Sequence, residues 1–149
     1  PIQHGSRGED TGLFNYDISG PNEIWEFGEE AYEIIKEILF FREKLKPYIM
    51  RQMKIASEKG TPPMRPLFYD FPEDENTWAI EDQYMFGSDI LVAPILFEGQ
   101  REREVYLPAG VNWVDLKTSR IYEGGQTITC AAPLDTIPFF VREGADIFS

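Results

Sequence analysis

The sequence is poor in the residues that build metal sites and in positive charge. Its 149 residues include one cysteine, one histidine, and 14 basic against 26 acidic residues. A lone cysteine, Cys130, forms no intrachain disulfide, and one His with one Cys makes no typical zinc site. The net charge of −12 argues against a nucleic-acid partner, because phosphates are bound by clustered Lys and Arg. We therefore expect no metal and no nucleic acid.

Three further patterns are missing. No apolar run reaches the roughly 18 residues of a membrane span, so we expect none. The sequence has no glycine-rich phosphate loop and no GxSxG nucleophile elbow, and we expect no cofactor. What is present is 42% hydrophobic and 14% aromatic residues, enough for a packed core. Cys130 is expected to act as a small buried hydrophobe in a strand.

The N-terminal half is predicted to be a loop followed by a long helix. Residues 1–22 are rich in Gly, Asp, Ser and Asn and are typical of a loop, which carries the only histidine, His4. From residue type alone, His4 is structural or merely exposed. Residues 23–59 place apolar side chains at helical spacing, with a break expected near Leu45 and an end at Gly60. The helix is interpreted as scaffold, with Phe40, Phe41 and Tyr48 in the core.

Two buried strands are predicted in the middle of the chain, at Met64–Phe71 and Asp89–Leu96, with a helical turn over Asn76–Tyr84. A helix followed by a buried strand is half of an α/β unit. Asp70 lies at the end of the first strand, where it is expected to accept backbone hydrogen bonds. Arg65 lies inside that strand, and a buried guanidinium needs a partner. A structural pair with one of the carboxylates of an α/β barrel is expected ahead of a substrate contact.

From Asp89 onward, short apolar segments separated by Gly and Pro predict an antiparallel β-sandwich. The alternating charges of residues 101–105 suggest an exposed edge strand. Tyr106 and Trp113 could form a sugar-stacking surface, although in a sandwich of this size the core is the favoured place for both.

Several motifs in order resemble the C-terminal part of glycoside hydrolase family 31, a family of α-glucosidases, α-xylosidases and related retaining enzymes. They are QHG, WEFGEEA, REKLKPY, GTPPMRPLFYDFP, DQYMFGSDILVAPIL, VYLPAG with NW after it, and PLDTIPFFVREGA. No single motif is diagnostic, but seven at compatible spacing make a strong signal.

The resemblance implies an α/β plus all-β fold. Residues 1–86 would be the last helix–strand portion of a (β/α)8 catalytic barrel, and residues 87–149 a proximal C-terminal β-sandwich domain. His4 would line the sugar subsite next to the cleaved bond as a substrate-binding residue. The two catalytic aspartates of the family would come from upstream barrel strands, so no catalytic residue is expected in this chain.

The function implied is that of a retaining α-glycosidase releasing terminal α-linked glucose from oligosaccharides, with this chain alone inactive. The alternatives are an α-xylosidase of the same family and a non-enzymatic carbohydrate-binding or interaction module. The chain begins at Pro1 without Met, so we expect a piece of a longer protein. Its uncovered apolar faces predict association with the missing N-terminal barrel portion or with itself. The location is open, with the cytoplasm favoured.

Overall fold

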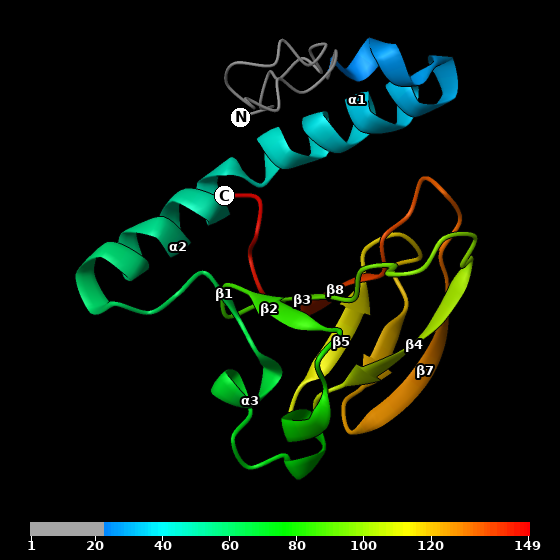
Figure 1. The fold of residues 1–149 in the computed structure, drawn as a ribbon. Coiled ribbons are helices and arrows are strands. Elements are labelled where there is room, and N and C mark those ends of the chain that lie inside the picture. The colour runs from blue at the N-terminus through cyan, green and yellow to red at the C-terminus, as the bar shows by residue number, and fades with distance from the viewer. Residues whose placement is uncertain (1–22) are drawn as a thin grey trace, which may run out of the picture. The chain divides into compact units, whose positions relative to one another are not determined.

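The computed structural model describes residues 23–149, and the chain divides into two compact units, 1–44 and 45–149. In the first unit, a 3-10 helix η1 (Ile24–Phe27) precedes helix α1 (Glu29–Lys44) (Figure 1). The first turn of α1 is acidic and its last turn basic, which complements the helix dipole.

The predicted break near Leu45 is confirmed. Leu45 caps helix α2 (Lys46–Lys59), whose first turn contains Pro47, a residue tolerated there because that turn has no intrahelical acceptor for its N–H. The predicted end is also confirmed, since Gly60 has a left-handed conformation and its N–H donates to Ala56 O at 3.0 Å. The core placement was correct for Tyr48, which is buried, and wrong for Phe40, which is 63% exposed.

The predicted buried strand Met64–Phe71 is wrong. Strand β1 covers only Met64–Arg65, and a helical turn, α3 (Leu67–Asp70), follows Pro66. The turn brings Asp70 back to Arg65, and their ion pair holds the chain in a bend where the apolar pattern suggested a straight strand. Because β1 pairs antiparallel, the described residues contain no parallel strand pair, and the predicted barrel portion is not shown in them.

The next elements are shorter than predicted. The 3-10 helix η2 (Glu75–Ala79) ends before Tyr84, which instead begins strand β2 (Tyr84–Phe86). Strand β3 (Ile90–Val92) ends four residues before the predicted Leu96. The other strands are β4 (Glu102–Leu107), β5 (Asn112–Asp115), β6 (Ile121–Glu123), β7 (Gln126–Ala131) and β8 (Phe139–Arg142).

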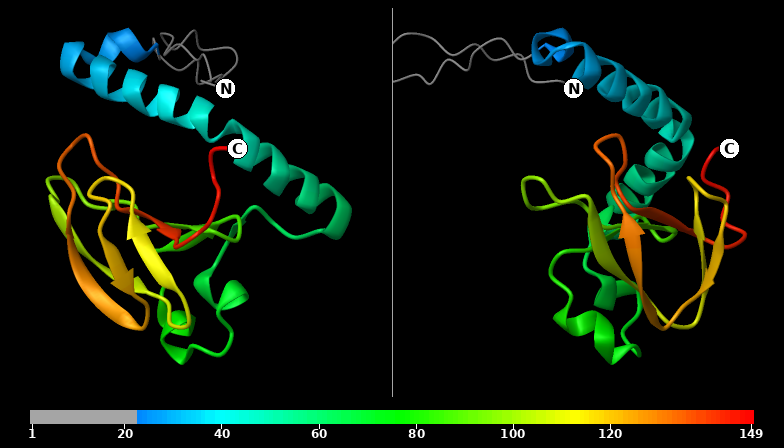
Figure 2. Two further views of the ribbon diagram at one scale, coloured as in Figure 1. Left: turned by 180° about the vertical axis from the view of Figure 1, so that it is seen from behind. Right: turned by 90° about the vertical axis from the view of Figure 1, so that its right-hand side faces the viewer.

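The strands form two antiparallel sheets, as the segment spacing predicted. One has six strands in the order β1-β2-β3-β8-β5-β6, and the other consists of β4 and β7, paired from Glu102↔Ala131 to Leu107↔Gln126. Figure 2 shows the β4–β7 pair from two sides. The short strand β6 was not predicted, because its side chains are mostly exposed and carry little apolar pattern.

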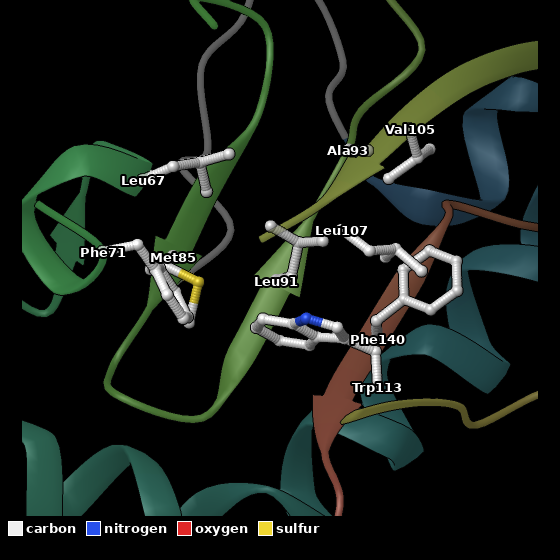
Figure 3. Packing of buried hydrophobic residues seen from close by; sticks show 9 residues of the cluster. All are labelled: Leu67, Phe71, Met85, Leu91, Ala93, Val105, Leu107, Trp113 and Phe140. Atoms are coloured by element: carbon white, nitrogen blue, oxygen red, sulfur yellow. The ribbon is translucent and has the colours of Figure 1, made fainter. Parts of the chain in front are cut away.

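The core lies between the two sheets (Figure 3). Val105 and Leu107 of β4 belong to one buried cluster with Leu91, Trp113 and Phe140 of the larger sheet. Trp113 is fully buried and its indole N–H donates to Pro108 O at 3.0 Å, so the core interpretation of this residue is confirmed.

Strand β4 is an edge strand, as its charges suggested, since within residues 23–149 it pairs only with β7, but one of its faces is buried. Its side chains alternate, and Arg103 points inward with Val105. The Arg103 guanidinium donates to Pro94 O at 2.6 Å and to Asp82 Oδ2 at 2.7 Å, which satisfies a buried charge. Cys130, in β7, is half-buried against the core, and burial raises the pKa of its thiol to about 11.

Candidate functional site

The substrate-binding residue predicted from the sequence, His4, lies outside the described residues. The same holds for the other charged residues of that loop, Arg7, Glu9 and Asp10. A site has therefore to be sought among residues 23–149.

An open groove of about 590 Å³ lies among the described residues. One side is the segment 70–76, which joins α3 to η2, and the other is the loop 109–111 after β4, with Arg142 of β8 between them. Small-molecule sites span about 300–1,000 Å³ and combine apolar walls with a few polar groups, so the groove is a candidate binding site.

Asp70, at one end of the groove, is held by Arg65. The Arg65 Nε lies 2.5 Å from Asp70 Oδ2, and its Nη2 lies 2.8 Å from Oδ1. The side chains are 5% and 13% exposed, and the hydrogen bond from the guanidinium to Asp70 raises the pKa of Arg65. The predicted structural pair is confirmed, and the partner of Asp70 is a guanidinium rather than the expected backbone.

Asp74 accepts the hydrogen bonds that join the two sides of the groove. Its Oδ2 accepts from Tyr106 Oη at 2.7 Å and from Ala109 N at 2.8 Å, while Oδ1 accepts from the backbone N and the side chain of Asn76. Burial alone would raise the pKa of Asp74, but the donors at Ala109, Tyr106 and Asn76 outweigh it and lower the pKa. Asp74 therefore stays ionised at neutral pH.

Arg142 supplies a positive charge beside the acidic wall. Its guanidinium carbon lies 4.7 Å from the centroid of the Phe71 ring, a cation–π contact. Its Nε is buried and has no hydrogen-bond partner within residues 23–149. The groove lining thus combines carboxylates with one guanidinium, whose Nε is buried.

The groove carboxylates do not form the pair that a retaining glycosidase uses. A retaining glycosidase uses two carboxyl groups about 5–5.5 Å apart, one as nucleophile and one as acid/base. Asp70 and Asp74 both accept hydrogen bonds from structural donors, and the lowered pKa of Asp74 does not suit a general acid. Over the described part of the chain, no group of three or more His, Cys, Asp and Glu could hold a metal ion.

An aromatic pair adjoins the groove and was missed at the sequence level. The rings of Phe68 and Trp78 stack with centroids 5.2 Å apart and an interplanar angle of 15°. The sequence offered Tyr106 and Trp113 as possible sugar-stacking residues but favoured the core for both, and Trp113 is buried while Tyr106 is partly exposed. Aromatic residues on two successive short helices were the available signal for Phe68 and Trp78.

The fold defines an antiparallel β-sandwich domain with an open groove at its surface. Residues 60–147 match the glycosyl hydrolase family 31 C-terminal domain, and the chain belongs to this family. It is 40% identical to alpha-glucosidase 2 of Bacillus thermoamyloliquefaciens over 125 residues, which are 84% of this chain and 16% of that protein. It is 42% identical to the alpha-xylosidase of Saccharolobus solfataricus, over 84% of this chain and 17% of that protein.

Solved structures show the same relation. A GH31 alpha-xylosidase from a soil metagenome, complexed with xylose, is 50% identical with a TM-score of 0.86, over 99% of this chain and 22% of that one. A Flavobacterium johnsoniae GH31 dextranase mutant complexed with isomaltotriose is 38% identical with a TM-score of 0.82, over 86% of this chain and 16% of that one.

The chain spans about a sixth of the length of these two curated relatives. No helix among residues 23–149 is long and apolar enough to cross a membrane. The cytoplasmic location favoured from the sequence stays a prediction, which fractionation of cells from the native source would check.

Proposed function

We propose that this chain forms the C-terminal portion of a retaining α-glycosidase that hydrolyses terminal α-linked glucose from oligosaccharides. The observation that carries the proposal is the match of residues 60–147 to a family 31 C-terminal domain, together with 84% coverage of the chain by an alpha-glucosidase about five times as long. The catalytic aspartates would lie upstream of this sequence. Residues 1–86 would complete the barrel, and residues 87–149 would form the sandwich that supports it.

An α-xylosidase is the second candidate. The 50% identity to a solved alpha-xylosidase over 99% of this chain favours it. Glucosides and xylosides differ at the sugar C6 group, and the residues that accept or exclude this group are expected on upstream loops. The test is the ratio of kcat/KM for aryl α-glucoside and aryl α-xyloside, measured on the protein encoded by the reading frame extended upstream of Pro1. A non-enzymatic module is the reading left if that frame carries no paired aspartates at strand ends.

We propose that His4 donates a hydrogen bond to a sugar hydroxyl in the subsite next to the cleaved bond. In the extended protein, His4→Ala is expected to lower kcat/KM about 10- to 100-fold, because a buried sugar hydroxyl would lose its partner at about 1–3 kcal/mol. His4→Gln keeps a directed donor and should lose less. Steady-state kinetics with the aryl glycoside measure both, and an unchanged kcat/KM in His4→Ala would contradict the role.

The partner proposed for the isolated chain is the upstream barrel portion, or a second copy of the chain in its absence. Large apolar side chains lie exposed on several elements of the second unit, among them Met50, Met53 and Met64, each at least 50% exposed. Sizing with light scattering is expected to show association of the isolated chain. A monodisperse monomer would count against this proposal.

A further inference from the structure

We propose that the Phe68–Trp78 stack and the adjoining groove bind an α-linked oligosaccharide at a second site that takes no part in catalysis. The stack would hold the apolar face of one pyranose ring, and the groove would receive the hydroxyl groups of the next. The ligand class rests on the proposed glycosidase function. The site itself is built from contacts within residues 68–78, 109–111 and 142.

The stack is a preformed platform. Trp78 is 60% exposed, yet its indole plane is held by parallel contact with Phe68 and by a hydrogen bond from its Nε1 to Pro72 O at 3.3 Å. The indole N–H is thus satisfied without a ligand, and the large free area of the ring is apolar. Tyr69, on the same turn as Phe68, is 50% exposed, and the guanidinium carbon of Arg65 lies 5.2 Å from the centroid of its ring. A rigid, exposed ring loses little conformational entropy when a flat apolar face binds to it.

The groove continues from the stack through Pro72, which accepts the Trp78 hydrogen bond and also lines the groove. Next to it the wall presents the exposed side chains of Glu73, Glu75 and Asn76. Carboxylate and amide oxygens accept hydrogen bonds from hydroxyl groups, and the Arg142 guanidinium, a donor, lines the same groove. Apolar faces beside clustered acceptors and one donor match a sugar chain.

The other ligand classes fit this surface less well. An anion would meet four carboxylates in the lining, those of Asp70, Glu73, Asp74 and Glu75, against one guanidinium. The chain's net charge of −12 adds to the repulsion. A metal ion finds no group of three or more suitable ligands within residues 23–149. A neutral polyhydroxylated ligand remains, and isomaltotriose is the probe because a related dextranase has been solved with it.

The test uses the 149-residue chain and follows its three tryptophan indole N–H signals by ¹⁵N–¹H NMR during titration with isomaltotriose. Trp78→Phe and Trp25→Phe assign the signals. A saturable shift confined to Trp78 is expected, with Kd in the millimolar range usual for a small exposed site. The absence of a saturable shift up to about 50 mM isomaltotriose would overturn the proposal.

Substitutions distinguish the platform from nonspecific effects. Trp78→Ala is expected to weaken binding about tenfold or more, whereas the matched Trp25→Ala, at a residue that is 61% exposed in the other unit, should leave it unchanged. Phe68→Leu, which removes the stacking ring but keeps apolar bulk, should weaken binding less than Trp78→Ala. The buried Trp113 signal reports that each variant is folded.

Two further outcomes would also overturn the proposal. One is unchanged affinity in folded Trp78→Ala, and the other is a Trp78 shift that follows protein concentration instead of ligand, which would mean that a second copy covers the stack. The result is independent of hydrolysis, since binding is measured on a chain without catalytic residues. Failure of the proposed glycosidase function would instead show as an inactive extended protein.

Discussion

Gly87→Ala is expected to destabilise the second unit by about 3 kcal/mol or more. Gly87 has φ +65°, where an L side chain costs about 1–2 kcal/mol, and an added Cβ would lie 2.6 Å from Gln52 Cδ and closer still to Tyr48 Oη. Tyr48 cannot move aside cheaply, because it is 1% exposed and its Oη donates to Phe86 O and accepts from Asp89 N, both at 3.0 Å. Urea unfolding followed by circular dichroism measures the loss.

Gly99→Ala is the matched control, because Gly99 also has a positive φ, +75°, but nothing lies within 4 Å of its added Cβ. It should cost only the backbone term, about 1 kcal/mol. Tyr48→Phe removes the clashing Oη, so the double variant Tyr48→Phe, Gly87→Ala should lose less than the sum of the single losses. Equal losses in Gly87→Ala and Gly99→Ala would show that the close approach of α2 to the β2–β3 turn is not what Gly87 serves.

Arg65→Met is expected to destabilise the fold by about 3 kcal/mol, because it leaves the Asp70 carboxylate, 13% exposed, without its two guanidinium donors. Pro62 O would lose its donor as well. The bend between β1 and α3 depends on this pair, so the loss should appear in the midpoint of urea unfolding.

Arg65→Lys keeps the charge but cannot form two parallel hydrogen bonds, and its loss should be smaller, about 1–2 kcal/mol. Arg65→Met with Asp70→Leu removes both charges and should recover part of the stability lost in Arg65→Met. If Arg65→Met unfolds at the wild-type midpoint, the ion pair does not hold the bend.

The sequence predicted those elements whose ends or spacing are set by nearby residues. The helix break near Leu45, the end at Gly60 and the antiparallel strand pattern after Asp89 depend on proline, glycine and side-chain alternation, and all three were confirmed. The segment Met64–Phe71 was mispredicted, because its apolar run suits either a strand or a buried turn. The structure has the turn, in which the Arg65 side chain pairs with Asp70 five positions later.

The candidate site was harder to predict than the fold. Arg65 was assigned a carboxylate partner because burial demands one, whatever the fold. The groove could not be predicted in this way. Its two sides are joined by hydrogen bonds from Tyr106 and Ala109 to Asp74, more than 30 positions away in the sequence. No local pattern encodes that contact, and none marked Trp78 as an exposed ring stacked on Phe68. His4, assigned only by resemblance, stays a prediction.

The central claim is that this chain is the non-catalytic C-terminal portion of a retaining α-glycosidase. The most direct measurement compares the pure 149-residue chain with the product of the reading frame extended upstream of Pro1, each given an aryl α-glucoside and an aryl α-xyloside while ¹H NMR follows the released sugar. We expect no turnover by the chain alone, and hydrolysis by the extended protein with the α-anomer formed first. Saturable hydrolysis by the 149-residue chain would contradict the account, as would an extended protein that cleaves neither substrate.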